Sequence, residues 1–311
     1  MLKNDSKLIS LEEAVALIPD GANCSFSGFS ETNNPMSFVR QMIRAEKKHL
    51  EVSGMGDAQS VELLCGAEAV DLVRVSNYMA RNGRCPNFSR CVENGTLKTE
   101  DYSHFGITNR FFAAAMGIPF MPVKVMIGSD MSRIQRIDAG TKIREIEDPF
   151  TGERCGIMPA LSPDFAIIQV ARADELGNCQ LYGITSSIEI IARAAKHVIV
   201  TAEEIVSTDE IRRTNQYTIL PSFFVDHVVH CPFGAYPGGV YTYYDYDLEH
   251  LALITRSGKK PETMRQYLNE WIYGTADEAA FFEKVGIRRL MELRADPYSG
   301  VSLRNRGYYD E

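Results

Sequence analysis

The chain has 311 residues, of which 45% are hydrophobic and 24% are charged, and its formal net charge at pH 7 is −8. A chain of this length buries roughly three quarters of its unfolded surface, as one large domain or two modest ones. The acidic balance and the scattered Lys and Arg exclude a nucleic-acid partner, because phosphate binding needs clustered cations. One small anionic ligand remains compatible with this charge.

The seven cysteines are odd in number, and none is spaced from another as Cys-x-x-Cys. This usage is typical of reduced thiols in the cytoplasm, and it predicts neither a disulfide framework nor a metal site. The N-terminal Met-Leu-Lys-Asn-Asp-Ser-Lys lacks the apolar core of a signal peptide. Because no apolar run reaches the roughly 20 residues that cross a bilayer, we expect a soluble cytoplasmic protein with no membrane partner.

The first predicted elements are a helix, a strand and a second helix. Ser10 and Glu13 form a capping box ahead of a short helix, which a Pro-Asp-Gly turn ends. Residues 22–26 are the first expected strand, with a loop at its carboxyl end. Asn34 is expected to cap the next helix, and Pro35 to be its first residue.

Short apolar runs rich in β-branched residues then alternate with helical patterns. This alternation predicts βαβ units, and therefore an α/β fold with an open, mainly parallel sheet. We expect one domain over residues 1–311 with a helical C-terminal part at about 246–311. The Pro- and Gly-rich segment 148–163 fits a domain boundary or an ordered loop, and we favour the loop because the composition does not change there. Expected strands lie at 49–53, 72–75, 165–170, 197–202 and 225–230, and expected helices at 59–67, 88–92, 106–116, 187–195, 208–213, 262–273 and 276–285.

No nucleotide fingerprint is present, because the sequence has neither Gly-x-Gly-x-x-Gly nor a Walker-A motif. Gly28 nevertheless follows the first expected strand. Ligands bind at the carboxyl ends of strands in open α/β sheets, and a glycine there permits close approach of the backbone. Taken by itself, Gly28 favours the ordinary alternative, which is a glycine that serves only to make the turn.

His104 differs from the other histidines, because it follows a polar segment at a predicted strand-to-helix junction. A histidine there can hydrogen-bond a carbonyl or move a proton near pH 7. An ordinary role in capping the helix fits the sequence equally well. His227 and His230 are three apart in a strand and so on opposite faces, which disfavours joint metal binding. We expect His49 and His250 on the surface.

Two carboxylate positions are candidates for covalent catalysis. Glu93 precedes Asn-Gly, where we favour an ordinary helix end with a glycine cap. Glu203 and Glu204 follow an apolar strand, where an active-site carboxylate fits the pattern, but we favour an exposed helix start. The tyrosine-rich segment 236–246 fits a ligand or subunit surface as well as ordinary packing.

Several segments together resemble the family I coenzyme A transferases and are similar to the α subunit of glutaconate CoA-transferase. They occur in the family's order along nearly the whole chain, including the helical C-terminal part around Trp271. The segments are residues 20–35, 97–104, 113–122, 200–206, 209–213, 234–237 and 244–247.

This resemblance implies a three-layer α/β fold of the NagB/RpiA/CoA-transferase type and an enzyme built from α and β subunits. It also implies that a glutamate of the β subunit attacks an acyl-CoA. The reaction would pass through an acyl-glutamyl anhydride and a glutamyl-CoA thioester before a carboxylic acid accepts the CoA. No cofactor would be bound permanently, since coenzyme A enters as a thioester substrate. The expected assembly is αβ, (αβ)2 or larger, and Glu93 is not expected to be a nucleophile.

By position in the family, this chain would supply the wall of the acyl pocket, with His104 as an acid/base or an oxyanion contact. The expected substrate-binding residues lie in loops after the predicted strands: Gly28, Phe29, Ser30, Asn33, Asn34, Tyr78, Asn82, Ser103, Gly128 and Ser129.

Two departures from the family pattern bear on the substrate. Glutaconate-type α subunits have basic residues where this chain has Asn33 and Asn34, so a dicarboxylate substrate is disfavoured. They also have Gln where this chain has His104, and related steroid-ring-cleaving hydrolases have Glu. Two alternatives therefore stay open: an acyl-CoA or ring-opening hydrolase with His104 as acid/base, and, less favoured, a non-catalytic sugar-phosphate-type binding module.

Overall fold

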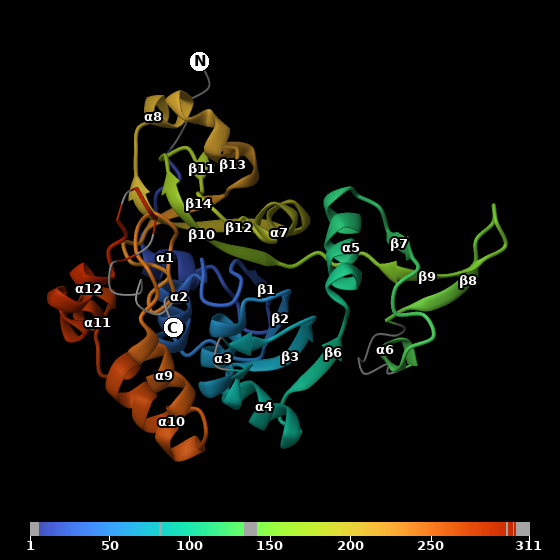
Figure 1. Cartoon of the computed structure of the whole chain (residues 1–311), viewed down its shortest axis with the longest axis horizontal. Coiled ribbons are helices and arrows are strands. Elements are labelled where there is room, and N and C mark those ends of the chain that lie inside the picture. The colour runs from blue at the N-terminus through green and yellow to red at the C-terminus, as the bar shows by residue number, and fades with distance from the viewer. Residues whose placement is uncertain (1–5, 81–82, 134–141, 297, 301, 303–311) are drawn as a thin grey trace.

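The central sheet is built from strands of both halves of the chain (Figure 1). The computed structural model describes residues 6–80, 83–133, 142–296, 298–300 and 302. Parallel strands lie in the order β14–β12–β10–β1–β2–β3–β6, and β11 and β13 extend the sheet antiparallel beside β10. The predicted mainly parallel α/β sheet is confirmed. Its strands are β1 (Asn23–Phe26), β2 (Leu50–Gly54), β3 (Val70–Val75), β6 (Lys98–Asp101), β10 (Phe165–Ala173), β11 (Cys179–Gln180), β12 (His197–Ile205), β13 (Thr218–Leu220) and β14 (His227–His230).

Alternate residues of one strand enter two different hydrophobic clusters, one on each face of the sheet. On β10, Ile167 belongs to the first cluster and Ile168 to the second, and Ile199 and Val200 of β12 divide in the same way. Successive strand side chains point to opposite faces, so a sheet covered on both faces needs continuous apolar runs of this kind. Helices α1 (Leu11–Ala16), α2 (Met36–Arg44) and α3 (Ala58–Gly66) cover the first face, and α5 (His104–Ala115) and α7 (Ile188–Ala194) cover the second.

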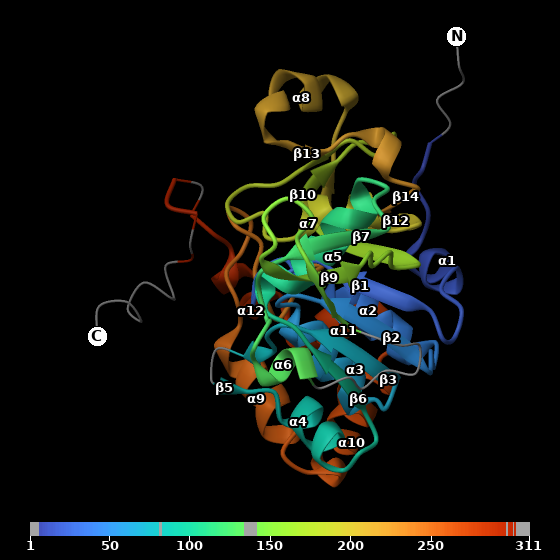
Figure 2. The same ribbon diagram turned by 90° about the vertical axis from the view of Figure 1, so that its right-hand side faces the viewer.

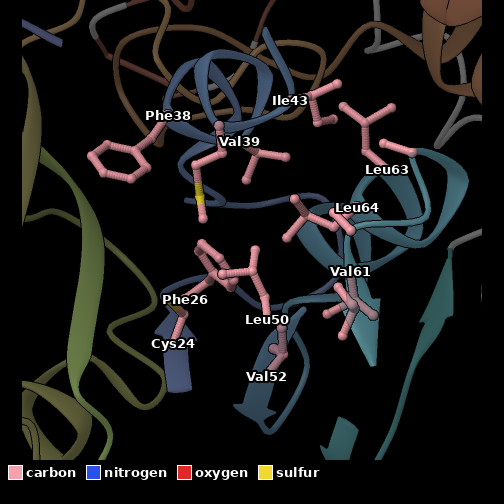
Figure 3. Packing of buried hydrophobic residues seen from close by; sticks show 14 of the residues in the cluster. Cys24, Phe26, Phe38, Val39, Ile43, Leu50, Val52, Val61, Leu63 and Leu64 are labelled. Carbon is pink, nitrogen blue, oxygen red and sulfur yellow. The ribbon is translucent and has the colours of Figure 1, made fainter. Parts of the chain in front are cut away.

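Helices α2 and α3 pack directly on β1 and β2 (Figure 3). Phe38 of α2 and Leu50 of β2 are fully buried there. Each such side chain contributes about 1.5–3 kcal/mol to folding by leaving water. The same cluster contains Cys24, Phe26, Val39, Ile43, Val52, Val61, Leu63 and Leu64.

The C-terminal helices pack against α2 as well as against one another (Figure 1). Glu278 of α11 accepts hydrogen bonds from Arg40 and Arg44 of α2, and the Arg40 side chain is only 1% exposed. His250 lies in this region and is buried, where it contacts the hydroxyls of Tyr236 and Tyr267. The expected surface position of His250 is therefore wrong. These helices are α9 (Leu248–Ser257), α10 (Pro261–Tyr267), a π-helical turn (Leu268–Tyr273), α11 (Glu278–Val285) and α12 (Ile287–Leu293).

A second, three-stranded antiparallel sheet projects from the main body beyond α5 (Figures 1 and 2). Its strands are β7 (Phe120–Val123), β8 (Arg144–Glu147) and β9 (Arg154–Pro159), so segment 148–163 is a hairpin turn plus a strand and not the predicted loop. Arg110 of α5 fastens this sheet, since its Nε donates to the carbonyl of Pro159 at 2.9 Å and its own carbonyl accepts from Leu161 N at 3.0 Å.

Two local differences from the predicted elements matter for the site, and one prediction there is confirmed. Pro35 is the cap of α2, and the Asn34 side chain bonds the preceding loop instead of the helix. Glu203 and Glu204 belong to β12, which continues past its apolar part, so the predicted helix start is wrong. Glu93 does end a helix, α4 (Pro86–Glu93), and Gly95 follows with φ +72°.

No helix in the described part of the chain is long and apolar enough to cross a membrane.

Candidate functional site

The loops after β1, β2, β3 and β6 meet at the carboxyl edge of the main sheet. Neighbouring parallel strands end at the same edge, so the residues that follow them come together. Ser30 N donates to the carbonyl of Gly56 at 2.9 Å, which joins the loops after β1 and β2. The Oγ of Ser76 lies 3.1 Å from Nδ1 of His104, which joins the loops after β3 and β6.

The turn after β1 requires a glycine at position 28. Gly28 has φ +120°, and a Cβ there would lie 2.7 Å from Cγ and Nδ2 of Asn34. That region of φ is unfavourable for an L side chain, and the close approach of Asn34 leaves no room for one. Phe29, which follows, is 45% exposed and packs one ring edge over Gly56.

Asn33 and Asn34 are both buried, but their hydrogen bonds differ. Asn34 Nδ2 donates to the carbonyls of Ser30, at 2.9 Å, and Thr32, at 3.3 Å, and so holds the loop closed. Asn33 Nδ2 donates to the carbonyl of Ile184, while its Oδ1 is buried without a hydrogen-bond partner. An unpaired buried oxygen costs about 1–3 kcal/mol, so Asn33 is the better placed of the two to accept from a ligand donor.

His104 stands at the start of α5, as the predicted strand-to-helix junction requires. Ser103 caps the helix by accepting from Gly106 N at 3.0 Å, and His104 is the first helical residue. The imidazole is exposed, and its contact is Ser76. The side chain that caps the helix is therefore Ser103, which leaves the His104 ring free for a ligand.

The turn at Gly128 and Ser129 packs at the same end of α5. Ser129 Oγ donates to the carbonyl of Met126 at 2.6 Å, and Gly128 has φ +77°. The sulfur of Met126 sits 2.9 Å from where a Cβ on Gly106 would be. This contact fixes the turn near the first turn of α5.

Tyr78 and Asp57 form a buried polar pair behind these loops. Burial raises the pKa of Asp57 to about 7, and burial together with Asp57 raises the pKa of Tyr78 well above its ordinary value. Asp57 Oδ2 and the Tyr78 hydroxyl are buried and have no hydrogen-bond partner with suitable geometry. We did not predict Asp57, although its place after β2 in Gly-Met-Gly-Asp would have singled it out. Asn82 lies outside the described residues.

A second cleft opens at the carboxyl ends of β10 and β12. Its volume is about 740 Å³, and Glu203 at its floor accepts from Gln169 Nε2 at 2.8 Å and from Phe233 N. Burial raises the pKa of Glu203 to about 8. Glu204 is exposed and accepts from the Tyr243 hydroxyl at 2.8 Å. Part of the predicted tyrosine segment thus lines a cleft, with Arg172, Tyr182, Tyr217, Tyr243 and Tyr244 among its walls.

The chain matches a family model described as coenzyme A transferase over residues 8–231. An uncharacterised protein of Archaeoglobus fulgidus is 35% identical over 94% of the chain, and the match spans 66% of that relative, just under two thirds of its length. The A subunit of glutaconate CoA-transferase from Acidaminococcus fermentans is 31% identical over 96% of the chain and 98% of the relative.

Two solved structures share the fold at the same level of identity. The crystal structure of glutaconate coenzyme A-transferase from Acidaminococcus fermentans matches with a TM-score of 0.89 and 31% identity, covering 96% of this chain and 98% of that one. A variant of the decarboxylase AibA/AibB matches with a TM-score of 0.75 and 31% identity, covering 85% of this chain and 100% of that one. The second name shows that chemistry other than CoA transfer is carried out on this fold.

Proposed function

The chain belongs to the coenzyme A transferase family, and we propose that it is the α subunit of a heteromeric enzyme that moves CoA between an acyl-CoA and a carboxylic acid. The observation that carries the proposal is the near full-length likeness to one subunit of such an enzyme, combined with polar loops at one sheet edge. The partner would be a β subunit, in an αβ, (αβ)2 or larger assembly. Coenzyme A would enter as a thioester substrate, with nothing bound permanently.

The nucleophile of this reaction would be a glutamate of the β subunit. Attack of a carboxylate on the thioester forms an acyl-glutamyl anhydride and releases CoA thiolate, which then attacks to give a glutamyl-CoA thioester and the free acid. A second carboxylate completes the transfer by the reverse steps. Glu93 is a poor candidate, since it is exposed at the end of α4, in a groove formed with α9.

The α chain would supply the wall that positions the acyl group and excludes water, which otherwise hydrolyses the anhydride. We assign this wall to Gly28, Phe29, Ser30, Asn33 and His104, with the neighbouring residues of the same loops. The loop after β1 carries no cation, because Asn33 and Asn34 stand where glutaconate-type subunits are basic. This favours an acyl group without a second carboxylate.

The test is reconstitution with the proposed β subunit, followed by incubation with an acyl-CoA and acetate. Formation of acetyl-CoA, with a hydroxylamine-sensitive acyl-glutamyl species on the β subunit, is the expected result. Release of free CoA at the same rate with and without acetate would overturn the transferase assignment.

Hydrolysis of an acyl-CoA is the second candidate, and the exposed imidazole of His104 favours it. A water activated by this ring would attack the thioester or a ring carbonyl and release CoA or a ring-opened acid. The reconstitution separates the two reactions, because a hydrolase needs no carboxylate acceptor. No observation favours a non-catalytic sugar-phosphate module, and we do not propose one.

A further inference from the structure

Ser76 is placed beside His104 by the pairing of their strands. In the parallel register of β3 and β6, Val75 pairs with Asp101, so the next residues of both strands leave the sheet side by side. Ser76 follows directly after β3, and its Oγ reaches Nδ1 of His104 at 3.1 Å. The same Oγ lies 3.4 Å from the carbonyl oxygen of Met55, which follows β2.

Counting protons decides which ring nitrogen of His104 carries hydrogen. The Ser76 hydroxyl has one proton, and a carbonyl oxygen has none to offer, so the contact with Met55 uses the hydroxyl proton. The contact with His104 then needs a proton from Nδ1. The reverse arrangement directs the hydroxyl proton to Nδ1 and leaves two oxygens facing each other with no proton between them. Both contacts are satisfied only when His104 carries its proton on Nδ1.

The surroundings of His104 hold its backbone in place beside the loop after β2. Thr108 Oγ1 donates to the carbonyl of His104 at 2.7 Å and also contacts the sulfur of Met55 at 2.7 Å, so the first turn of α5 is tied to the loop after β2. In the described part of the chain Nε2 of His104 has no partner, and the side chain is exposed. In the neutral ring the tautomer is set by the hydrogen bond of the other nitrogen, so Nε2 then presents a lone pair.

We propose that Ser76 is a positioning residue that fixes His104 with Nε2 as a proton acceptor, and that the pocket therefore takes an O–H donor opposite this nitrogen. The substrate assignment rests on the proposed function. The donor is a hydroxyl of the acyl chain or a water molecule, and a carboxylate tail is disfavoured because it would face a lone pair. This agrees with the uncharged Asn33 and Asn34 in the neighbouring loop.

The tautomer is measured without any activity assay. The full chain labelled with ¹⁵N-histidine is studied by long-range ¹H–¹⁵N correlation, and H104Q identifies the signals of His104. Wild type and S76T should show the pattern of a protonated Nδ1, whereas S76A should shift toward the Nε2-protonated form that free histidine prefers. An Nε2-protonated wild type, or an S76A spectrum identical to wild type, would overturn the proposal.

The substrate arm uses the reconstituted complex with a 3-hydroxyacyl-CoA, the matching unsubstituted acyl-CoA and a dicarboxylic acyl-CoA. S76A should lower kcat about 10-fold with KM nearly unchanged, and S76T should restore it. A loss confined to the hydroxyacyl substrate identifies the acyl hydroxyl as the donor, and a loss confined to CoA release without acceptor identifies water. Equal rates for S76A and wild type overturn the proposal. A complex with neither activity refutes the proposed function, while the spectra still decide the role of Ser76.

Discussion

The side-chain amide of Asn34 occupies the space that a Cβ on Gly28 would need, with only 2.7 Å between them. The pair closes the loop after β1, since the same amide donates to the carbonyl of Ser30. Gly28 is thus required both by its φ of +120° and by its neighbour.

Replacing Gly28 with Ala should destabilise the protein by about 2–4 kcal/mol, from strained φ and from displacement of Asn34. Urea denaturation measures this change in the free energy of unfolding. Gly95→Ala is the matched control, because Gly95 also has positive φ but a Cβ there meets nothing within 4 Å. It should cost only about 1 kcal/mol. Equal losses for both variants would contradict a role for Asn34.

Glu203 should make folding stability fall with rising pH. Burial raises its pKa from 4.5 to about 8, so between these values the folded state holds a proton that the unfolded state has lost. The free energy of unfolding is therefore highest below about pH 4.5, declines through this window by on the order of 5 kcal/mol, and is level above about pH 8.

The variant E203Q should remove this decline, because an amide does not titrate. Denaturation midpoints at several pH values between 5 and 8.5 provide the comparison. The two proteins should be compared by the slope of stability against pH, since the amide also changes the hydrogen bonds with Gln169 and Phe233. Asp57 and Glu62, whose pKa values burial raises to about 7, contribute equally to both proteins. Parallel slopes in the two proteins would refute the prediction.

Removing Glu278 should loosen the C-terminal helices. The side chain neutralises Arg40 and Arg44, which are 1% and 8% exposed, and E278A would leave both cations buried and unpaired. The expected loss is about 3–5 kcal/mol, with faster proteolysis near α11. Glu283→Ala, on the exposed side of the same helix, is the control and should change stability by less than about 0.5 kcal/mol. Identical proteolysis of the two variants would show that the pairing of Glu278 with Arg40 and Arg44 does not hold the C-terminal helices in place.

The variant E93A should leave turnover of the reconstituted complex within a few fold of wild type. Glu93 is an exposed helix end, and its removal changes no buried contact. Complete loss of the acyl-enzyme species in E93A would place the nucleophile on this chain.

The variant H104Q should lower hydrolysis by about 100-fold or more if the ring moves a proton, because glutamine cannot do so, and it should change transfer less. Steady-state rates with and without acetate show which reaction is affected. If both rates are unchanged, His104 has no place in the pocket.

The main sheet could be predicted because each buried strand is a short run of apolar, β-branched residues. The small sheet could not, since every residue of β8 is exposed and its sequence has no apolar run. His250 was misplaced for a related reason: its charged neighbours in the sequence suggest a surface, whereas packing with Trp271 and Phe281 buries it.

The sequence predicted where the site residues lie more successfully than it predicted the burial and hydrogen bonding of the polar groups around them. The rule that loops meet at the carboxyl ends of strands was enough to place Gly28 and His104 at one edge. The same rule would have placed Asp57 there, since it follows β2, but it could not select Ser76, whose significance comes from one hydrogen bond. The burial of Glu203 was missed because its hydrogen-bond donors come from distant segments of the chain.

Because Arg110 joins the small sheet to α5, this sheet is attached to the same helix as His104. Arg110 lies on the helix that His104 begins, and its bonds to Pro159 and Leu161 span the joint between helix and sheet. Phe150, at the tip of the β8–β9 hairpin, is 94% exposed and far from any packing constraint. A fluorescent or spin label at this position would report movements of the small sheet during turnover without touching the pocket.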